Sequence, residues 1–204
     1  ANPIMNLKDL GCEPVPVSVT GNDKYSDIIL GLIRDKRVDT THIIRDASYV
    51  LPVKTRIMAG SVHTVKQQIV RIDRYHEKKK QVFDEKLLIE RLKKLAPSCE
   101  VILVSDYDGG IISDNVIKAV NAMAKKGKRV VVDSRYMLKK FRYITTGTPN
   151  ETEAGPLVEM EEYDDEAVEI MAKKLAMAIR SKGMIITRGS KGMLVFEKGK
   201  ARRV

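Results

Sequence analysis

The sequence predicts an α/β fold in which helices cover a largely parallel sheet. From about residue 85 onward, helical and strand patterns alternate, as is typical of βαβ units. The strand candidates in this region are continuous apolar runs, which are expected where a sheet is covered on both faces. A length of 204 residues is enough to bury one sizeable core. We therefore expect a single α/β domain over residues 1–204.

The first helix of the alternating region is expected to begin after Asp84, which can cap it. Pro97 should stop this helix, because proline cannot continue the hydrogen-bonding pattern. Residues 101–104 are then predicted to form a strand covered on both faces. The apolar residues that would share one face of the helix are Leu87, Leu88, Leu92 and Leu95.

Two further helix and strand pairs follow. Ser113 or Asp114 can open a helix that ends near residues 125–127, and residues 129–133 form the next strand. Asp164 or Asp165 can open a helix that ends near Gly183, before a strand at 184–187. Residues 193–200 resemble a hairpin. The side chains expected to face inward are Val116, Ile117, Val120 and Met123 in the first helix, and Ala167, Val168, Met171, Leu175 and Ile179 in the second.

Residues 50–75 differ from the rest, because apolar side chains there alternate with polar or charged ones. Such alternation predicts strands with one face in water. We expect a small β lid beside the main sheet, at a place where it could cover a substrate. The residues that suggest these strands are Val53, Thr55, Ile57, Ile69, Val70 and Ile72.

Composition excludes several classes of protein. No window approaches the apolar length of a transmembrane helix, and no signal-peptide pattern is present, so we expect a cytoplasmic protein. The two cysteines and three histidines lack metal-ligand spacing. A net charge of +10 indicates anionic partners, among them phosphorylated small molecules. Nucleic acid is a weaker alternative that depends on the lysines at 78–80, because aromatic residues are only 5% and no recognition motif is visible.

Polar residues follow the predicted strands at four places. Because ligands of open α/β sheets gather at the carboxyl ends of the strands, these residues could line one edge of the sheet. A short run at 143–145 precedes the third of these places. The four sets are Ser105-Asp106-Tyr107, Asp133-Ser134-Arg135, Asn150 with Glu153, and Thr187-Arg188-Gly189.

Asn150 and Glu153 lie three residues apart, at the predicted start of a helix after Pro149. Free N–H groups at such a position can bind phosphate, and the Glu153 carboxylate could hold Mg²⁺ through water. The alternative is a capping box, in which Asn150 is the N-cap and Glu153 closes the first turn. The spacing alone does not separate the two interpretations.

The order of the motifs resembles that of the ribokinase-like (PfkB) family of carbohydrate kinases. Residues 148–153, with the pattern Thr-Pro-Asn-x-x-Glu, are similar to the family's Mg²⁺ and phosphate motif, and residues 187–193 resemble its nucleotide-proximal segment. Residues 1–2 resemble the end of its glycine-rich sugar-binding element, and residues 20–23 resemble the next signature. The resemblance implies a three-layer, Rossmann-like sheet with helices on both faces and a small β lid at 50–75.

Among the branches of the family, the chain is most similar to the heptose-7-phosphate kinases of ADP-heptose and lipopolysaccharide precursor synthesis. Matching segments are 54–56, 67–68, 71–73 and 105–107. The chain departs from this branch at Gly109, where a lysine is expected, and at Ser134-Arg135 in place of Pro-Lys. The family's first strand and its Gly-Ala-Gly-Asp loop, which carries the catalytic base, have no counterpart in residues 1–204.

The resemblance implies ATP-dependent phosphorylation of a sugar or sugar phosphate, such as heptose 7-phosphate at its anomeric hydroxyl. ATP and Mg²⁺ would be the cofactors, and Glu153 would hold Mg²⁺ through water. Residues implied in substrate binding are Asn2, Asp23, Lys54, Arg56, Arg71 and Asp106. Residues implied around the nucleotide and its phosphates are Asn150, Glu153, Thr187, Arg188, Gly189 and Gly192.

Alternatives remain at this level. The chain could belong to a kinase of another sugar or of a nucleoside, or it could keep the fold without catalysis. The missing segments would leave a sheet edge open to pairing, which is compatible with a homodimer.

Overall fold

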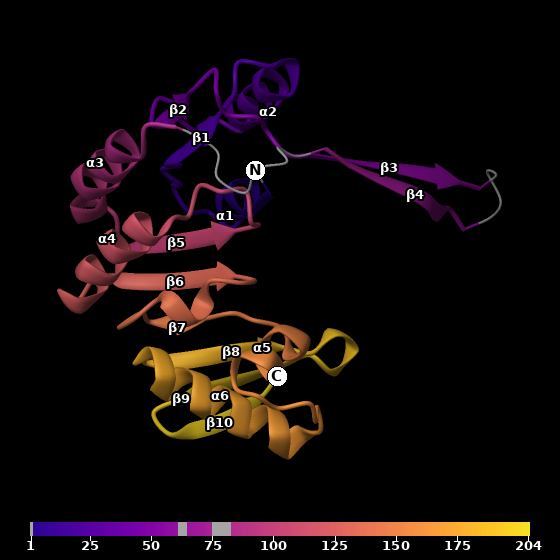
Figure 1. The fold of residues 1–204 in the computed structure, drawn as a ribbon, viewed down its shortest axis with the longest axis vertical. Helices are drawn as coiled ribbons and strands as arrows, with labels where there is room; N and C mark the ends of the chain where they lie inside the picture. The colour runs from indigo at the N-terminus through magenta and orange to yellow at the C-terminus, as the bar shows by residue number, and fades with distance from the viewer. Residues whose placement is uncertain (1, 61–64, 75–82) are drawn as a thin grey trace. The chain divides into compact units, whose positions relative to one another are not determined.

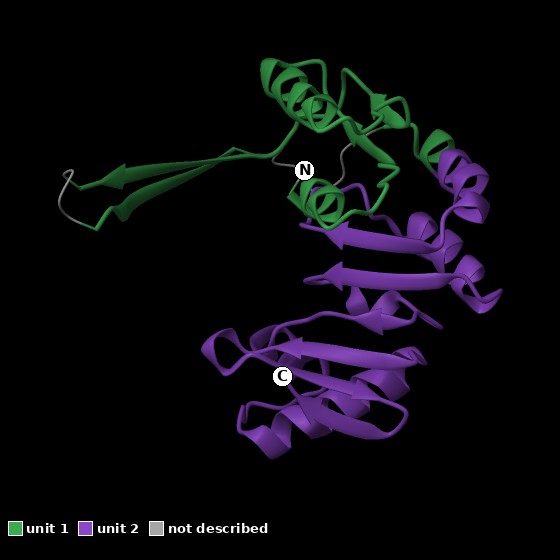
Figure 2. Ribbon diagram, turned by 180° about the vertical axis from the view of Figure 1, so that it is seen from behind, with its two compact units in different colours: residues 1–88 green, residues 89–204 purple. Residues whose placement is uncertain are grey.

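The computed structural model describes residues 2–60, 65–74 and 83–204. The predicted sugar-binding segment at Ala1 and the lysine run at 78–80 therefore lie partly or wholly outside the described residues. The chain divides into two compact units, Ala1–Leu88 and Ile89–Val204, which are described separately (Figure 2). The expectation of a single domain over 1–204 stays a prediction.

The second unit is built on a six-stranded mixed sheet with the order β10-β9-β8-β7-β6-β5 (Figure 1). Neighbouring strands from β5 to β8 run parallel, and β9 and β10 add an antiparallel hairpin. The predicted α/β class is confirmed. The strands are β5 (Val101–Asp106), β6 (Arg129–Ser134), β7 (Thr146–Gly147), β8 (Gly183–Thr187), β9 (Met193–Glu197) and β10 (Lys200–Arg203).

The predicted helix starts of this region are confirmed by their caps. The Asp84 carboxylate accepts a hydrogen bond from the Leu87 N–H, Ser113 Oγ from Val116, and Asp164 from Ala167. Each cap satisfies an N–H group that has no partner within its helix. The helices are α3 (Glu85–Leu95), α4 (Asp114–Lys125), α5 (Glu151–Leu157) and α6 (Asp165–Ile179), with short 3₁₀ turns η1 (Ala96–Ser98), η2 (Leu138–Lys140) and η3 (Gly189–Lys191).

The core of the second unit lies between α6 and the middle of the sheet. All five apolar residues expected on the inner face of α6 are buried, and Met171, Leu175 and Ile179 have no exposed surface. They pack near strands β8 and β9, whose Met184, Ile186 and Leu194 are also fully buried. This apolar packing holds the carboxyl end of β8 in a defined place.

Four details differ from the sequence-based expectation. Val101 and Leu103 of β5 are 43% and 40% exposed, whereas Ile102 and Val104 are buried, so only one face of this strand is covered; the prediction that both faces are covered is wrong there. Met123 of α4 is only half-buried. Helix α6 ends at Ile179, where Arg180 adopts a left-handed conformation with φ 54°, and not near Gly183. The run at 143–145 precedes the short strand β7 and does not form it.

The described residues of the first unit form two helices, the start of α3 and two small sheets. Helices α1 (Asn2–Asp9) and α2 (Lys24–Asp35) accompany a parallel pair, β1 (Ser18–Thr20) and β2 (Ile43–Arg45). Strands β3 (Val53–Ala59) and β4 (Gln67–Arg74) form a separate antiparallel sheet, with a bulge between Ile57 and Met58 (Figure 1). The strands expected in 50–75 are thus present. None of the described helices is long and apolar enough to cross a membrane.

Gly183, where the predicted end of α6 proves to be the start of β8, offers a test of the sheet. A Cβ at this position would lie 2.6 Å from the backbone oxygen of Phe196 in β9, so the two strands must separate to admit it. We expect Gly183→Ala to lower the free energy of unfolding by about 1–3 kcal/mol, as is usual for overpacking. Urea denaturation followed by circular dichroism measures this change.

Gly31→Ala is the matched control, because a Cβ in that part of α2 would meet nothing within 4 Å. Alanine at a helical glycine should stabilise the protein by about 0.5–1 kcal/mol. Equal effects of the two substitutions would contradict the close approach of β8 and β9.

Candidate active site

The loop that leads into α5 is fixed between two strands of the parallel sheet. The Thr148 N–H donates to the Val132 carbonyl of β6 at 3.0 Å, and the Thr187 N–H of β8 donates to the Pro149 carbonyl at 3.0 Å. Asn150 also forms a parallel bridge with Thr187. The predicted motif at 148–153 and the predicted segment at 187–193 are therefore brought together at the carboxyl end of the sheet.

Both halves of a capping box are present at the start of α5. Asn150 Oδ1 accepts from the Glu153 N–H at 2.8 Å, and the Glu153 carboxylate accepts from the Asn150 N–H at 3.2 Å. The Thr152 hydroxyl also donates to Asn150 Oδ1. The capping interpretation of the spacing is confirmed. One oxygen of Glu153, Oε1, lies 3.7 Å from Arg135 Nε and takes no part in the cap.

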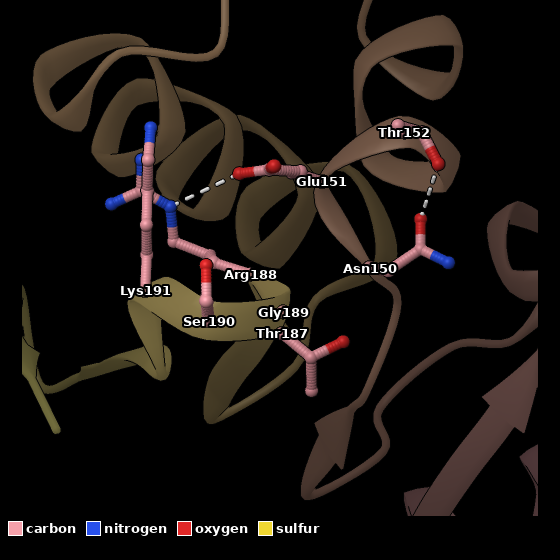
Figure 3. Close-up of a pocket in the computed structure, with 8 residues that line it drawn as sticks. All are labelled: Asn150, Glu151, Thr152, Thr187, Arg188, Gly189, Ser190 and Lys191. Atoms are coloured by element: carbon pink, nitrogen blue, oxygen red, sulfur yellow. Dashed lines mark hydrogen bonds and ion pairs between the residues drawn. The ribbon is translucent and has the colours of Figure 1, made fainter. Parts of the chain in front are cut away.

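A shallow pocket of about 350 Å³ lies between the start of α5 and the turn after β8 (Figure 3). Seven of its eight lining residues, all but Gly189, carry polar or charged side chains, which suits a polar ligand. The lining residues are Asn150, Glu151, Thr152, Thr187, Arg188, Gly189, Ser190 and Lys191.

The turn after β8 requires glycine at two positions. Gly189 and Gly192 adopt φ of 56° and 77°, a region that residues with a Cβ rarely occupy. A Cβ at 192 would also collide with the backbone oxygen of Val204, which accepts a hydrogen bond from the Met193 N–H. Gly189 has open space around its Cα, so a ligand could approach the backbone there.

Arg188 is one of the lining residues, but its guanidinium group is buried and forms its hydrogen bonds with the protein. The side chain is 2% exposed and donates to Glu151 Oε2 at 3.1 Å, to Asp165 Oδ1 at 2.5 Å and to the Tyr163 carbonyl at 3.1 Å (Figure 3 shows the contact with Glu151). The hydrogen bond from Arg188 lowers the pKa of the Asp165 carboxyl. The sequence did not identify Glu151 and Asp165 as partners of Arg188, because acidic residues in the first turn of a helix are also expected from the helix dipole alone.

Three carboxylates come close enough to influence one another at the ends of β5 and β6 and in α5. Asp106 accepts a hydrogen bond from Ser134 Oγ at 2.7 Å. Burial raises the pKa of the Asp133 carboxyl, and the negative charges of Glu153 and Asp106 raise it further. Among the residues that the structure describes, no three acidic, histidine or cysteine side chains are close enough to hold a metal ion directly. The oxygen donors of this acidic cluster (Asp106, Asp133, Glu153) nevertheless suit Mg²⁺ bound through water.

The cations predicted for substrate binding lie on the β3–β4 hairpin. Arg56 pairs directly opposite Arg71, and Lys54 opposite Asp73, so all four side chains belong to one face of the hairpin. Arg71 Nε also lies 3.0 Å from Asp73 Oδ1. Lys54, Arg56 and Arg71 are all exposed.

The other predicted residues of the first unit have a local role in the structure. Asp23 is the N-cap of α2 and accepts from the Tyr25 N–H, the Ser26 N–H and the Ser26 hydroxyl at 2.8–3.0 Å. Burial raises the pKa of the Asp23 carboxyl, but the hydrogen bonds from Ser26 and Tyr25 outweigh it and the net shift is downward. Asn2 is exposed at the first position of α1. Capping of α2 thus accounts for Asp23 without a ligand.

Comparison with known families gives one match over the entire chain. The family described as "pfkB family carbohydrate kinase" matches residues 1–204. Among curated proteins, the Bifunctional protein HldE of Geobacter sulfurreducens is 34% identical over 196 residues, which make up 95% of this chain and 39% of that protein. The protein of the same name from Geotalea uraniireducens is 32% identical, with 96% and 39% covered. The chain thus spans about two fifths of the length of these relatives.

Solved structures share the fold. Escherichia coli phosphofructokinase-2 in complex with fructose-6-phosphate superposes with a TM-score of 0.75 at 17% identity, over 100% of this chain and 65% of that one. Ribokinase from Thermotoga maritima gives 0.62 at 20% identity, over 98% and 62%. At such identities the similarity shows the architecture, and the predicted ribokinase-like fold is confirmed.

The raised pKa of Asp133 leads to a prediction about stability. Because the folded protein binds this proton more tightly than the unfolded chain does, the ionised carboxylate destabilises the fold above its pKa. We expect Asp133→Asn to raise the free energy of unfolding at pH 7.5 by roughly 0.5–1 kcal/mol, a range that allows for screening by water. The gain should vanish as the pH falls through the Asp133 pKa, and urea denaturation between pH 4 and 8 measures it.

Glu161→Gln is the control, because Glu161 is an exposed carboxylate outside the acidic cluster. It should leave stability unchanged within about 0.5 kcal/mol, as is normal for surface substitutions. If Asp133→Asn destabilised the protein at neutral pH, the mutual repulsion of the three carboxylates would be refuted.

Proposed function

Because the chain belongs to the pfkB family of carbohydrate kinases, we propose that it forms part of an enzyme that phosphorylates a sugar phosphate, heptose 7-phosphate at the anomeric hydroxyl, with ATP as donor. A phosphoryl group would pass from ATP to the hydroxyl oxygen, ADP would leave, and the hydroxyl proton would pass to a general base. The single observation that carries the proposal is the meeting of the α5 entry, the turn after β8 and the acidic cluster at the carboxyl ends of one sheet.

The residues of the second unit would act by positioning and by charge. Glu153 and Asp133 would bind Mg²⁺ through water, and bound Mg²⁺ would supply positive charge next to the transferred phosphoryl group. The backbone at Thr187, Gly189 and Gly192 would border the nucleotide. Lys191 is an exposed cation that lines the same pocket and could neutralise a phosphate.

The hairpin supports a phosphorylated substrate. Like charges directly opposite each other across two strands repel, and Asp73, which lies 3.0 Å from Arg71, supplies only one negative charge to a face that carries Lys54, Arg56 and Arg71. A phosphate held by both guanidinium groups, with Lys54 on the same face, would relieve this repulsion. We therefore assign substrate-phosphate binding to this cationic face of the hairpin, which would act as the lid.

The choice of heptose 7-phosphate rests on the resemblance of segments 54–56, 67–68 and 71–73 to that branch of the family. Gly109, which replaces the lysine of the branch, is the specific observation in favour of a second candidate, a kinase of another sugar or of a nucleoside. ATP and sugar phosphates are metabolites of the cytoplasm, where we place the reaction.

The opposite face of the hairpin is apolar and exposed. Ile57, Val70 and Ile72 are 48%, 45% and 43% exposed and lie on the face away from Arg56 and Arg71. A second copy of the chain could bury this face, and one structure that shares the fold is described as a tetrameric form of phosphofructokinase-2. We therefore propose a homodimer formed through the apolar face of the hairpin.

The proposed activity is tested with the full-length protein, ATP, Mg²⁺ and a panel of sugars and sugar phosphates. We expect turnover with heptose 7-phosphate. We further expect Arg56→Gln or Arg71→Gln to raise the KM for the phosphorylated sugar about 10-fold or more, because each removes a charge-assisted hydrogen bond. Steady-state kinetics with coupled detection of ADP gives these values.

Arg74→Gln is the matched control, since Arg74 lies on the same strand but on the opposite face. Its KM should equal that of the unsubstituted protein. Absence of ATP turnover with every compound of the panel would sink the proposed activity, and turnover only with unphosphorylated acceptors would favour the second candidate.

The proposed homodimer is tested by introducing a charged residue on the apolar face of the hairpin. We expect Ile57→Lys to convert the dimer into a monomer, because burying an unpaired ammonium group between two copies is strongly unfavourable. Sedimentation velocity measures the change, with Thr41→Lys, at an exposed position outside the hairpin, as the control. A dimer that survives Ile57→Lys, or a monomeric parent protein, would exclude this interface.

A further inference from the structure

Arg188 holds an unusual position among the described residues, because it is their only buried charged side chain. Removing a guanidinium group from water costs several kcal/mol unless hydrogen bonds and opposite charges replace the lost hydration. Glu151, Asp165 and the Tyr163 carbonyl supply that replacement. The desolvation of Arg188 beside the candidate active site therefore points to a role for this side chain.

The three partners of Arg188 come from different elements. Glu151 is the first residue of α5, Asp165 is the first residue of α6, and Tyr163 lies between these helices. Arg188 itself follows the last residue of β8. One planar group therefore ties the end of a core strand to the starts of two helices, and its fork of donors fixes the directions of these contacts.

The backbone of Arg188 organises the glycine turn at the same time. Its N–H donates to the Gly192 carbonyl at 2.9 Å, and its carbonyl accepts from the Lys191 N–H at 3.1 Å. The side chain and the main chain of one residue thus hold the two walls of the pocket, the turn at 189–192 and the start of α5. Glu151 is adjacent to Asn150, whose capping box fixes Glu153.

We propose that Arg188 is a positioning residue: through Glu151 and Asp165 it holds the glycine turn that borders the nucleotide in a fixed place relative to Asn150 and Glu153. This inference rests on the proposed kinase function. Arg188 would act through the protein, since its side chain is 2% exposed and its donors bond to Glu151, Asp165 and the Tyr163 carbonyl. Its effect is on the alignment of the reacting groups, where small displacements have large effects on rate.

If Arg188 positions the reacting groups, its substitution should lower kcat and leave the affinity for ADP unchanged. We expect Arg188→Lys, which keeps the charge but loses the fork, to lower kcat about 10-fold or more. Glu151→Gln weakens the hydrogen bond between Arg188 and the partly exposed Glu151, and we expect it to lower kcat about 3-fold. The dissociation constant of ADP, measured by isothermal titration calorimetry, should stay within about 2-fold in both variants, because the Arg188 side chain is buried and glutamine keeps the shape of Glu151 at the pocket wall.

The test uses the full-length protein and compares these variants with Glu166→Gln. Glu166 is an exposed carboxylate next to Asp165, and its substitution should leave kcat and ADP affinity unchanged. Circular dichroism and active-site titration with ADP normalise all rates to folded protein. If Arg188→Lys fails to fold, Glu151→Gln carries the test by itself.

Three results would overturn the proposal. The first is an unchanged kcat per folded molecule in the variants, which would mean a structural role only. The second is ADP affinity that falls along with kcat, which would mean direct contact with the nucleotide. The third is an equal loss in Glu166→Gln. These outcomes are distinct from a failure of the kinase function, in which the unsubstituted protein itself shows no ATP turnover.

Discussion

The candidate site depends on two backbone hydrogen bonds that hold the α5 entry between β6 and β8. The Thr148 N–H donates to Val132, and the Thr187 N–H donates to Pro149. Strand β7 has only two residues, so these bonds do much to hold the loop after it. Because the apolar side chains of β6 and β8 pack in a fully buried core, the hydrogen bonds to these strands also fix the position of the start of α5.

Charge is arranged unevenly around this loop. Burial raises the pKa of the Asp133 carboxyl, and the charges of the nearby carboxylates Glu153 and Asp106 raise it further. The carboxylates Glu151 and Asp165 both pair with the buried Arg188, and Asp165 Oδ2 also lies 3.4 Å from Arg203 Nε. Carboxylates that lack a paired cation destabilise a fold but attract a cation from solution. Carboxylates that are paired with an arginine instead hold the connected elements in place. The first group therefore suits ligand binding, and the second suits support of the walls.

The fold could be predicted well where local and long-range preferences agree. The caps Asp84, Ser113 and Asp164 were identifiable, because short polar side chains before an apolar helical stripe have few other uses. The predicted inner face of α6 is buried throughout for the same reason. The prediction failed for Val101 and Leu103, because an apolar run does not reveal whether one face of its strand or both faces will be covered by other elements.

The order of the motifs, the α/β class and the polar residues that follow the strands could all be predicted from the amino-acid sequence. The sequence also contained the two interpretations of Asn150 and Glu153, between which spacing cannot decide. The folded chain was needed to see that Asp23 caps a helix and that Arg56 faces Arg71. It alone revealed that Arg188 turns into the protein. The direction of a side chain depends on partners such as Asp165, which lies 23 residues away along the chain and meets Arg188 only once α6 has packed on the sheet.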